Sequence, residues 1–419
     1  MNVFPFGKVI ILILQGIPSA ILNPFFWLVL FIVWNQYKRT AALEKDLFGT
    51  VKINPRDKVL YAIFYGILGG MIGSLTVMLL GISITEAGLI YVWPLALILA
   101  LIHPHLMCFS YAGGIVALFS LMTGLLRIDV AGLMGLVAVL HFVESLLIYF
   151  AGHINATPVF VKNERHGIVG GFSLQEFWPV PIMLLTVITG DFPSMDVVQM
   201  PDWWPLIRPP AHILQNTQAI YLMLPVVAAL GYGDIALTRT PKNRCKSTAK
   251  NLLIFSSTLL LLSVLASRHT AFAYIAAFFA PAGHELLIIT GKKSERKNKP
   301  LFIPQEKGEM VLDTVKNSSA EKMGISSGDI IMSVNGQDLA KPGKLKEVLS
   351  EYPTYIWMTV KTPDGKIKDV EINAFPNGIN TIGAILVPRD SSGSYVVMEK
   401  ANILEKLKNL FKKRSAKNK

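Results

Sequence analysis

The sequence predicts a polytopic α-helical membrane bundle of about nine spans, followed by a small α+β domain. Hydrophobic residues make up 52% of the 419-residue chain, charged residues only 16%, and the mean hydropathy is +0.46. Such a composition is too apolar for an ordinary soluble protein. Apolar runs long enough to cross a bilayer recur up to about residue 290 and are absent afterwards. We therefore expect a transmembrane domain over residues 1–291, a soluble domain over 300–389 and a basic amphipathic tail over 390–419.

The candidate spans are apolar segments of the length that a bilayer requires. The sixth is the least regular, because it is short and carries Pro179 and Pro181; it is interpreted as a kinked span or a re-entrant segment. Cys108 and Cys245 are the only cysteines, so no disulfide framework is expected. The spans cover residues 21–34, 59–82, 89–103, 107–126, 130–150, 177–189, 213–237, 252–266 and 270–289.

Basic residues predict the orientation, since Lys and Arg accumulate in cytoplasmic loops. They gather after the first, fifth, seventh and ninth candidate spans, whereas the intervening loops are short or acidic. An odd number of spans with the N-terminus outside puts all four basic segments on one side. The C-terminal domain is therefore expected in the cytoplasm. The basic residues are Lys38, Arg39, Lys45, Lys52, Arg56, Lys58, Lys162, Arg165, Arg239, Lys242, Arg244, Lys246, Lys250, Lys292, Lys293, Arg296, Lys297 and Lys299.

One motif in the apolar part resembles the end of a potassium-channel filter. It is Gly231-Tyr232-Gly233-Asp234. A filter needs stacked backbone carbonyls that replace the hydration shell of the ion. The preceding Thr-Val pair is absent here, and the motif adjoins a basic cytoplasmic loop, whereas a filter lies toward the outside. The context argues against a channel.

A second motif begins like a zinc-protease helix, with His284 followed by Glu285. The usual second histidine would lie four residues later on the same helix face, where this chain has Ile288. His141 and Glu144 lie three residues apart in another span, but no completing ligand pattern is recognisable. The sequence therefore predicts no metal site and no catalytic residues.

Four ionisable residues are expected at or near membrane depth: His103, His105, Glu144 and Asp234. Such residues suggest a proton or ion path. The other interpretation is that the histidines cap a turn near the interface and that Glu144 bonds within the bundle. Their scattered placement favours this second interpretation.

The C-terminal domain shows alternating strand and helix signals. Strands are expected around Val311 and Val315 and over 330–334, 355–360 and 368–374, with helices over 319–323 and 344–349. The run from Gly308 to Gly336 resembles the signature of PDZ domains. That resemblance implies a small domain that binds an extended peptide as an added strand between a sheet edge and a helix.

The resemblance also implies a carboxylate-binding loop of the form apolar-Gly-apolar, and no such loop precedes Gly308. A matching triplet occurs near the end of the domain, followed by a strand-like segment. This suggests the circularly permuted strand order of bacterial relatives, with a groove between that last strand and helix 344–349. The alternative is that residues 378–389 form only a linker with one last strand. The expected peptide-binding residues are Ile382, Gly383, Ala384, Ile385, Leu386, Leu345, Val348 and Leu349.

The tail carries apolar residues at helical spacing among many lysines. Such a helix can lie on anionic lipid, or it can pack on the preceding domain. Nucleic acid is not an expected partner, although the net charge is +12, because the basic residues lie where membrane topology already requires them.

Several membrane motifs, together with the order of many spans and then one PDZ domain, resemble the MinJ-type proteins of Firmicutes. The motifs are His141-Phe142-Val143-Glu144-Ser145, residues 155–162, residues 167–172 and Phe177-Trp178-Pro179-Val180-Pro181. The resemblance implies a septal and polar adaptor that joins the scaffold DivIVA to the division-inhibiting ATPase MinD, without catalysis and without a cofactor. Two other functions stay open: an ion or small-molecule transporter, and an intramembrane metalloprotease of the site-2 type that carries a PDZ domain.

Overall fold

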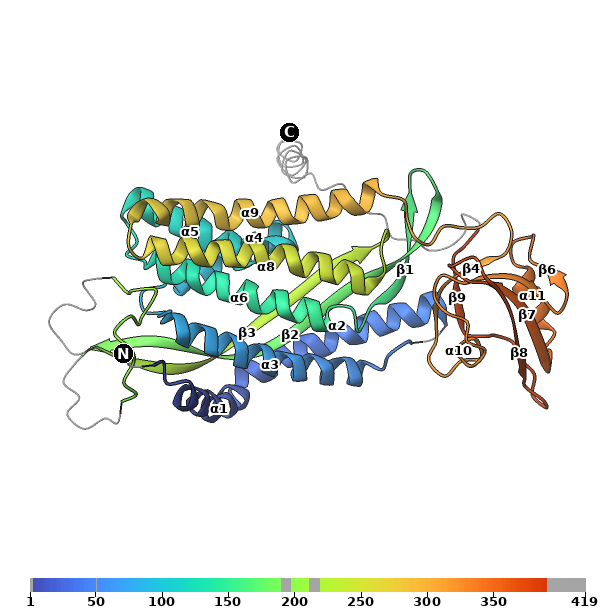
Figure 1. Cartoon of the computed structure of the whole chain (residues 1–419), viewed down its shortest axis with the longest axis horizontal. Coiled ribbons are helices and arrows are strands. Elements are labelled where there is room, and N and C mark those ends of the chain that lie inside the picture. Colours follow the sequence, from blue (N-terminus) through green and yellow to red (C-terminus); the bar gives the residue numbers. More distant parts are fainter. Residues whose placement is uncertain (1–2, 50, 190–196, 211–218, 390–419) are drawn as a thin grey trace, which may run out of the picture. The chain divides into compact units, whose positions relative to one another are not determined.

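The computed structural model describes residues 3–49, 51–189, 197–210 and 219–389 (Figure 1). The chain divides into two compact units. The first comprises residues 1–157 and 172–291, and the second comprises residues 158–171 and 292–419. The short segment 158–171 therefore belongs with the C-terminal domain and not with the helices that flank it in the sequence. The tail 390–419, with its expected lipid contact, lies outside the described residues.

Helices dominate the first unit, and several begin at a polar residue followed by proline. Asn23, Asn54 and Thr240 each cap a helix, with a side-chain oxygen that accepts a hydrogen bond from a backbone N–H of the first turn. Proline at the first helical position costs nothing, because its missing N–H would have no partner there. The helices are α1 (Phe6–Leu22), α2 (Pro24–Phe48), α3 (Pro55–Leu80), α4 (Leu89–Ile102), η1 (Pro104–Met107), α5 (Phe109–Thr123), α6 (Val130–Ala151), α8 (Pro241–Ala266) and α9 (Thr270–Lys297).

Four of the described helices, α3, α6, α8 and α9, are long and apolar enough to cross a membrane. The pair α1 and α2 bends by 66° and makes a fifth candidate if it is one span. Helices α4 and α5 are apolar but have only 14 and 15 residues. Among these four helices α6 is the most buried, since 72% of its apolar segment is buried. These helices fit a membrane protein.

Two of the nine expected spans are not helices. Residues 177–189 belong to strand β2 (Gly167–Thr189), and the described part of 213–237 forms β3 (Ala219–Ala236). The strands pair antiparallel without interruption, from Phe172 opposite Ala236 to Thr189 opposite Ala219. The expectation of helical spans was wrong here, because hydrophobicity alone does not distinguish a buried strand from a buried helix.

The edge of β2 that does not pair with β3 lies against α3. The backbone groups along this edge avoid being left without a hydrogen-bond partner in two ways. Pro179 and Pro181 have no N–H to leave unpaired, which is why proline suits an edge strand. Gly66 and Gly70 of α3 lie directly against the carbonyls of these two prolines. Further along, the N–H of Met183 donates to Ser74 Oγ at 2.8 Å, and that of Val187 donates to Thr85 Oγ1 at 2.7 Å. The strand can therefore lie among apolar helices without unsatisfied donors at these positions.

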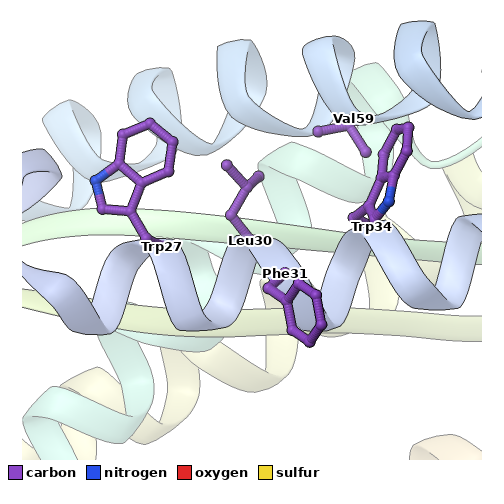
Figure 2. Close-up of a pocket in the computed structure, with 5 residues that line it drawn as sticks. All are labelled: Trp27, Leu30, Phe31, Trp34 and Val59. Carbon is purple, nitrogen blue, oxygen red and sulfur yellow. The ribbon is translucent and has the colours of Figure 1, made fainter.

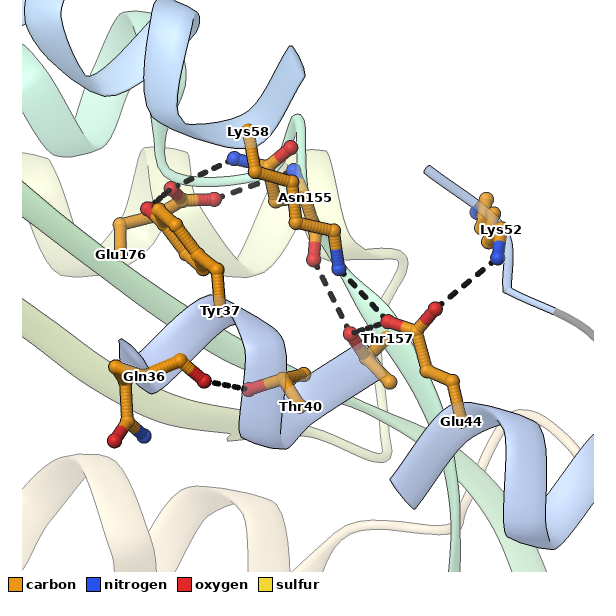
Figure 3. A network of polar contacts seen from close by, with 9 residues as sticks. All are labelled: Gln36, Tyr37, Thr40, Glu44, Lys52, Lys58, Asn155, Thr157 and Glu176. Atoms are coloured by element: carbon orange, nitrogen blue, oxygen red, sulfur yellow. Dashed lines mark hydrogen bonds and ion pairs between the residues drawn. The ribbon is translucent and has the colours of Figure 1, made fainter. Parts of the chain in front are cut away.

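A buried polar network joins α2, α3 and the start of β1 (Thr157–Asn163) with β2 (Figure 3). Lys58 Nζ lies 2.8 Å from Glu44 Oε1, and both side chains are 2% exposed. Thr157 Oγ1 donates to the same carboxylate at 2.9 Å. Beside it, Glu176 accepts hydrogen bonds from Tyr37 at 3.0 Å and from Asn155 at 3.0 Å. Paired in this way, the buried charges hold four separate segments in register.

The second unit contains a six-stranded sheet and two short helices. Its central path runs β8-β7-β5-β4-β9, with β6 beside β5. The elements are β4 (Glu309–Thr314), α10 (Ser319–Lys322), β5 (Ile330–Val334), β6 (Gln337–Asp338), α11 (Lys344–Ser350), β7 (Tyr355–Lys361), β8 (Ile367–Asn373) and β9 (Ala384–Leu386). The strands and helices expected from the sequence are confirmed, and β9 is the last strand that was expected within residues 378–389.

A buried aspartate explains part of the glycine-rich signature. Gly328 adopts a φ of +94°, which favours glycine. The following Asp329 is 2% exposed, and its carboxylate accepts from the N–H of Ser326 at 3.0 Å and pairs with Lys368 at 2.9 Å. The residues of the signature therefore form a tight turn that leads directly into β5, a strand of the hydrophobic core.

Candidate functional site

The predicted groove residues come from α11 and from β9 with the loop before it. Leu345, Val348 and Leu349 lie on α11, and all three are buried. They join Ile382 in a single hydrophobic cluster, against which Ala384 and Leu386 pack as partly buried residues. The sheet end at β9 and helix α11 therefore contribute to one hydrophobic core.

The loop before β9 is held tightly by its backbone. Gly383 has a φ of +72°, and a Cβ at this position would collide with Ser318. The carbonyl of Ile382 accepts from the N–H of Ala320 at 2.7 Å, and that of Gly383 accepts from the N–H of Val315 at 2.8 Å. Only glycine suits this position, both for its backbone angle and for the available space.

The backbone of β9 presents its outer edge to one side. Gly383 and Val387 bond to β4, the latter by donating to the carbonyl of Met310 at 2.9 Å. Because successive residues of a strand direct their backbone groups to opposite sides, the N–H and C=O groups of Ala384 and Leu386 point away from β4. Within the described ranges, β9 is the last strand at this end of the sheet. The edge has the form that strand addition requires.

The side chain of Ile385 points to the other face of the sheet. It lies outside the core cluster, as alternation with Ala384 and Leu386 requires. Of the eight residues named from the sequence, the structure thus brings Ile382, Ala384, Leu386 and the three α11 residues into one hydrophobic cluster, with Gly383 in the loop. Ile385 contributes backbone and not a groove wall.

Sequence reasoning missed a contact on that other face. The segment 158–171 forms a strand pair whose Gly170 donates its N–H to the carbonyl of Phe302 at 2.9 Å. A Cβ on Gly170 would lie 2.9 Å from Leu312 and 3.0 Å from Val387. Leu312, Val387 and Phe302 are all nearly fully buried. The segment that the sequence suggested as a loop therefore covers one face of the sheet of the second unit.

Asp234, flagged from the sequence as an intramembrane acid, has a structural partner. Its carboxylate receives Arg244 Nε at 2.8 Å and the other guanidinium nitrogen at 3.1 Å. Thr248 donates to it as well, at 3.2 Å. The Gly-Tyr-Gly-Asp motif lies in β3, where a bidentate ion pair ties the strand to the first turn of α8.

The two histidines that the sequence left unconnected lie together. His141 of α6 and His284 of α9 approach each other with Cys108, the residue that caps α5. Their possible ligand atoms all lie within 4.8 Å of one another. The sequence did not identify Cys108 as a neighbour of the two histidines, because it lies 33 residues from His141 and 176 residues from His284.

An apolar pocket of about 340 Å³ opens between α2 and α3 (Figure 2). Its lining consists of Trp27, Leu30, Phe31 and Trp34 from α2 and Val59 from α3. Convergent polar groups, which usually orient a substrate, are not among these residues. Its chemistry suits an acyl chain better than a polar solute.

Comparison with known proteins gives two kinds of match. A family model for the PDZ domain matches residues 281–349. The chain is 22% identical over 247 residues to the "Cell division topological determinant MinJ" of Bacillus subtilis, which covers 59% of each protein. It is 21% identical over 199 residues to the "Probable cell division topological determinant MinJ" of Lacticaseibacillus paracasei, covering 45% of this chain and 54% of that relative. The matched part thus spans less than two thirds of these relatives.

Proposed function

We propose that this chain, a MinJ-type cell division protein with a PDZ domain, is a membrane adaptor in division-site selection. The observations that carry the proposal are helices long and apolar enough to cross a membrane and, in the same chain, a sheet whose edge strand β9 presents outward-facing backbone groups. The similarity to proteins named as division topological determinants supports the cellular process. Neither part requires catalysis.

The groove lies between β9 and α11, and a partner segment adds to β9 as a further strand. In this arrangement the strand that borders the groove comes last in the chain, as in a circularly permuted PDZ domain. Backbone hydrogen bonds to Ala384 and Leu386 supply affinity, and the apolar surface over Leu345 and Val348 selects side chains. The partners are division proteins at the cytoplasmic membrane surface, of the DivIVA and MinD kinds.

The PDZ domain faces the cytoplasm, and the chain crosses the membrane several times. Replacing the expected sixth and seventh spans by the β2–β3 pair leaves the orientation unchanged, because a hairpin returns to the side from which it starts. The α4–α5 pair behaves in the same way. Five crossings, by α1–α2, α3, α6, α8 and α9, then keep the basic segments on one side. Anchoring at the membrane raises the local concentration of the groove for membrane-bound partners.

Partner capture tests the proposal. The full chain, purified in detergent, is mixed with the DivIVA-like and MinD-like proteins of the same organism, and the dissociation constants are measured. Leu386→Glu puts a charge beside the groove and should weaken binding at least tenfold. Ile367→Glu is the matched control, because Ile367 is 70% exposed on β8 at the opposite sheet end. Equal binding by wild type and Leu386→Glu would remove the groove from the contact, and no binding by wild type would refute the adaptor.

A further inference from the structure

We propose that Cys108, His141 and His284 form a metal site for zinc inside the helical unit. The possible ligand atoms come from α6, from α9 and from the residue that caps the N-terminus of α5. This inference goes beyond division-site selection and stands on different residues. It also departs from the sequence-based expectation of no metal.

Two of the three separations between possible ligand atoms are close to those of tetrahedral coordination. Cys108 Sγ lies 3.1 Å from His141 Nε2 and 3.8 Å from His284 Nε2. Zinc bonds of about 2.3 Å to sulfur and about 2.0–2.1 Å to nitrogen put tetrahedral ligand atoms about 3.5 Å apart. These two separations bracket that value. The two histidine nitrogens lie within 4.8 Å of each other, and zinc binding would bring them to about 3.5 Å.

Both imidazoles are oriented as zinc ligands usually are. His141 Nδ1 lies 2.7 Å from the carbonyl of Val137, which can only accept, so this nitrogen carries the proton. His284 Nδ1 lies 3.3 Å from the Tyr111 hydroxyl, and that hydroxyl donates its own proton to Glu285 at 2.6 Å. The Nδ1 of His284 is therefore the donor to the tyrosine oxygen. Both Nε2 lone pairs then point toward the thiol, with their tautomers set by outer partners.

Without a metal, the two imidazoles need two separate hydrogen-bond donors. A neutral thiol has one proton, which can satisfy only one of the two Nε2 acceptors. Ser110 Oγ lies 3.2 Å from His141 Nε2 and can serve that ring. A single cation bound to a thiolate would satisfy both imidazoles and the sulfur together. Mixed nitrogen and sulfur ligands favour zinc over calcium or magnesium.

The site lies at membrane depth. His141 lies near the middle of α6, and His284 lies near the middle of α9. Cys108 follows the turn between α4 and α5, which at 14 and 15 residues are about 21 and 22 Å long, shorter than the hydrocarbon core of about 30 Å. The α4–α5 pair is thus a re-entrant hairpin whose tip carries a ligand. Ionisable groups at this depth usually have a function.

Neighbouring side chains restrict access to the cluster and bring the carboxylate of Glu144 near it. Phe255 of α8 packs edge-on against both imidazoles, at 5.5 and 5.8 Å between ring centroids. Glu144, one turn after His141, interacts electrostatically with both histidines. Three protein ligands leave a fourth position for water or another small ligand.

Metal content of the full chain tests the site. The protein is purified in detergent with a tag that contains no histidine, stripped with a chelator, reloaded with zinc and desalted. Mass spectrometry of the metal should find about one zinc per chain in the wild type. The variants Cys108→Ala, His141→Asn and His284→Asn should each retain less than a tenth of that. Cys245→Ala and His269→Asn are matched controls, because neither residue belongs to the cluster, and both should keep the zinc.

A cobalt spectrum guards against misfolded variants. Wild-type protein loaded with cobalt(II) should show a thiolate-to-cobalt charge-transfer band and the strong visible bands of tetrahedral cobalt, and this measurement needs no variant. Wild type that retains no zinc overturns the site, as does equal retention by Cys108→Ala. Leu386→Glu should bind zinc like the wild type, so failure of the adaptor role and failure of the metal site remain distinguishable.

Discussion

Gly70→Ala should destabilise the helical unit, because Gly70 of α3 lies against the backbone of β2. An added Cβ would lie 2.9 Å from the carbonyl carbon of Pro181 and closer still to its oxygen. Ordinary contact begins at 3.4 Å, so the carbon alone requires a separation of 0.5 Å between the helix and the strand, and the nearer oxygen requires more. The same separation stretches the 2.8 Å bond from Met183 to Ser74, one turn further along α3.

The cost combines three effects. Overpacking contributes about 1–3 kcal/mol, and weakening the buried hydrogen bond from the N–H of Met183 contributes about 1–3 kcal/mol more. The better helix propensity of alanine offsets about 1 kcal/mol. The net loss is about 1–5 kcal/mol.

Thermal unfolding in detergent, followed by size-exclusion chromatography with fluorescence detection, measures the effect. Gly113→Ala in α5 is the matched control, because its Cβ would meet neighbouring side chains only at 3.4 Å or more. Gly70→Ala should unfold at a clearly lower temperature, and Gly113→Ala at the wild-type temperature or above it. Equal unfolding temperatures for the two variants would refute the packing of α3 on a strand.

Two further predictions concern buried charges. Lys58→Met leaves Glu44 buried without its cation and should cost about 3–5 kcal/mol, whereas the double variant Lys58→Met/Glu44→Met should recover much of the loss in a double-mutant cycle; additive losses would contradict the ion pair. Burial raises the pKa of Asp129, which caps α6, to about 6. Because the folded state holds this proton more tightly, stability should fall as pH rises from about 4 to about 7, by up to about 3 kcal/mol. Asp129→Asn keeps the cap and should remove this part of the pH dependence, and identical profiles would exclude Asp129 as its source.

The fold of the C-terminal domain was predictable because its signals are local. Gly328 and Asp329 define a turn, β-branched residues define the strands, and Gly383 marks the loop before β9. The helix starts could also be found, since Asn23-Pro24, Asn54-Pro55 and Thr240-Pro241 are capping pairs.

The strand pair β2–β3 was not predicted, because the prolines of β2 are compatible with two different structures. Pro179 and Pro181 were interpreted as signs of a kinked span or a re-entrant segment, although proline at alternate positions also suits an edge strand that has no second strand to donate to. Ser74 and Thr85, which accept from that edge, are recognisable only once α3 lies beside it.

The Cys–His cluster shows a different limit. His284 and Glu285 drew attention through spacing within one helix, and the expected fourth-residue partner was absent. The third ligand atom comes from a separate turn between two short helices, so spacing along the chain contains no signal for it. Only the arrangement of α5, α6 and α9 brings the three residues together.

The position of a fluorescent fusion in growing cells tests the adaptor role most directly. The full chain is compared with Leu386→Glu and with the control Ile367→Glu, in cells that lack the native protein. Signal at septa and poles for wild type and control, an even membrane signal for Leu386→Glu, and misplaced septa in the deletion strain are the expected results. An even membrane signal for all three proteins, with normally placed septa on deletion, would contradict a role in division-site selection.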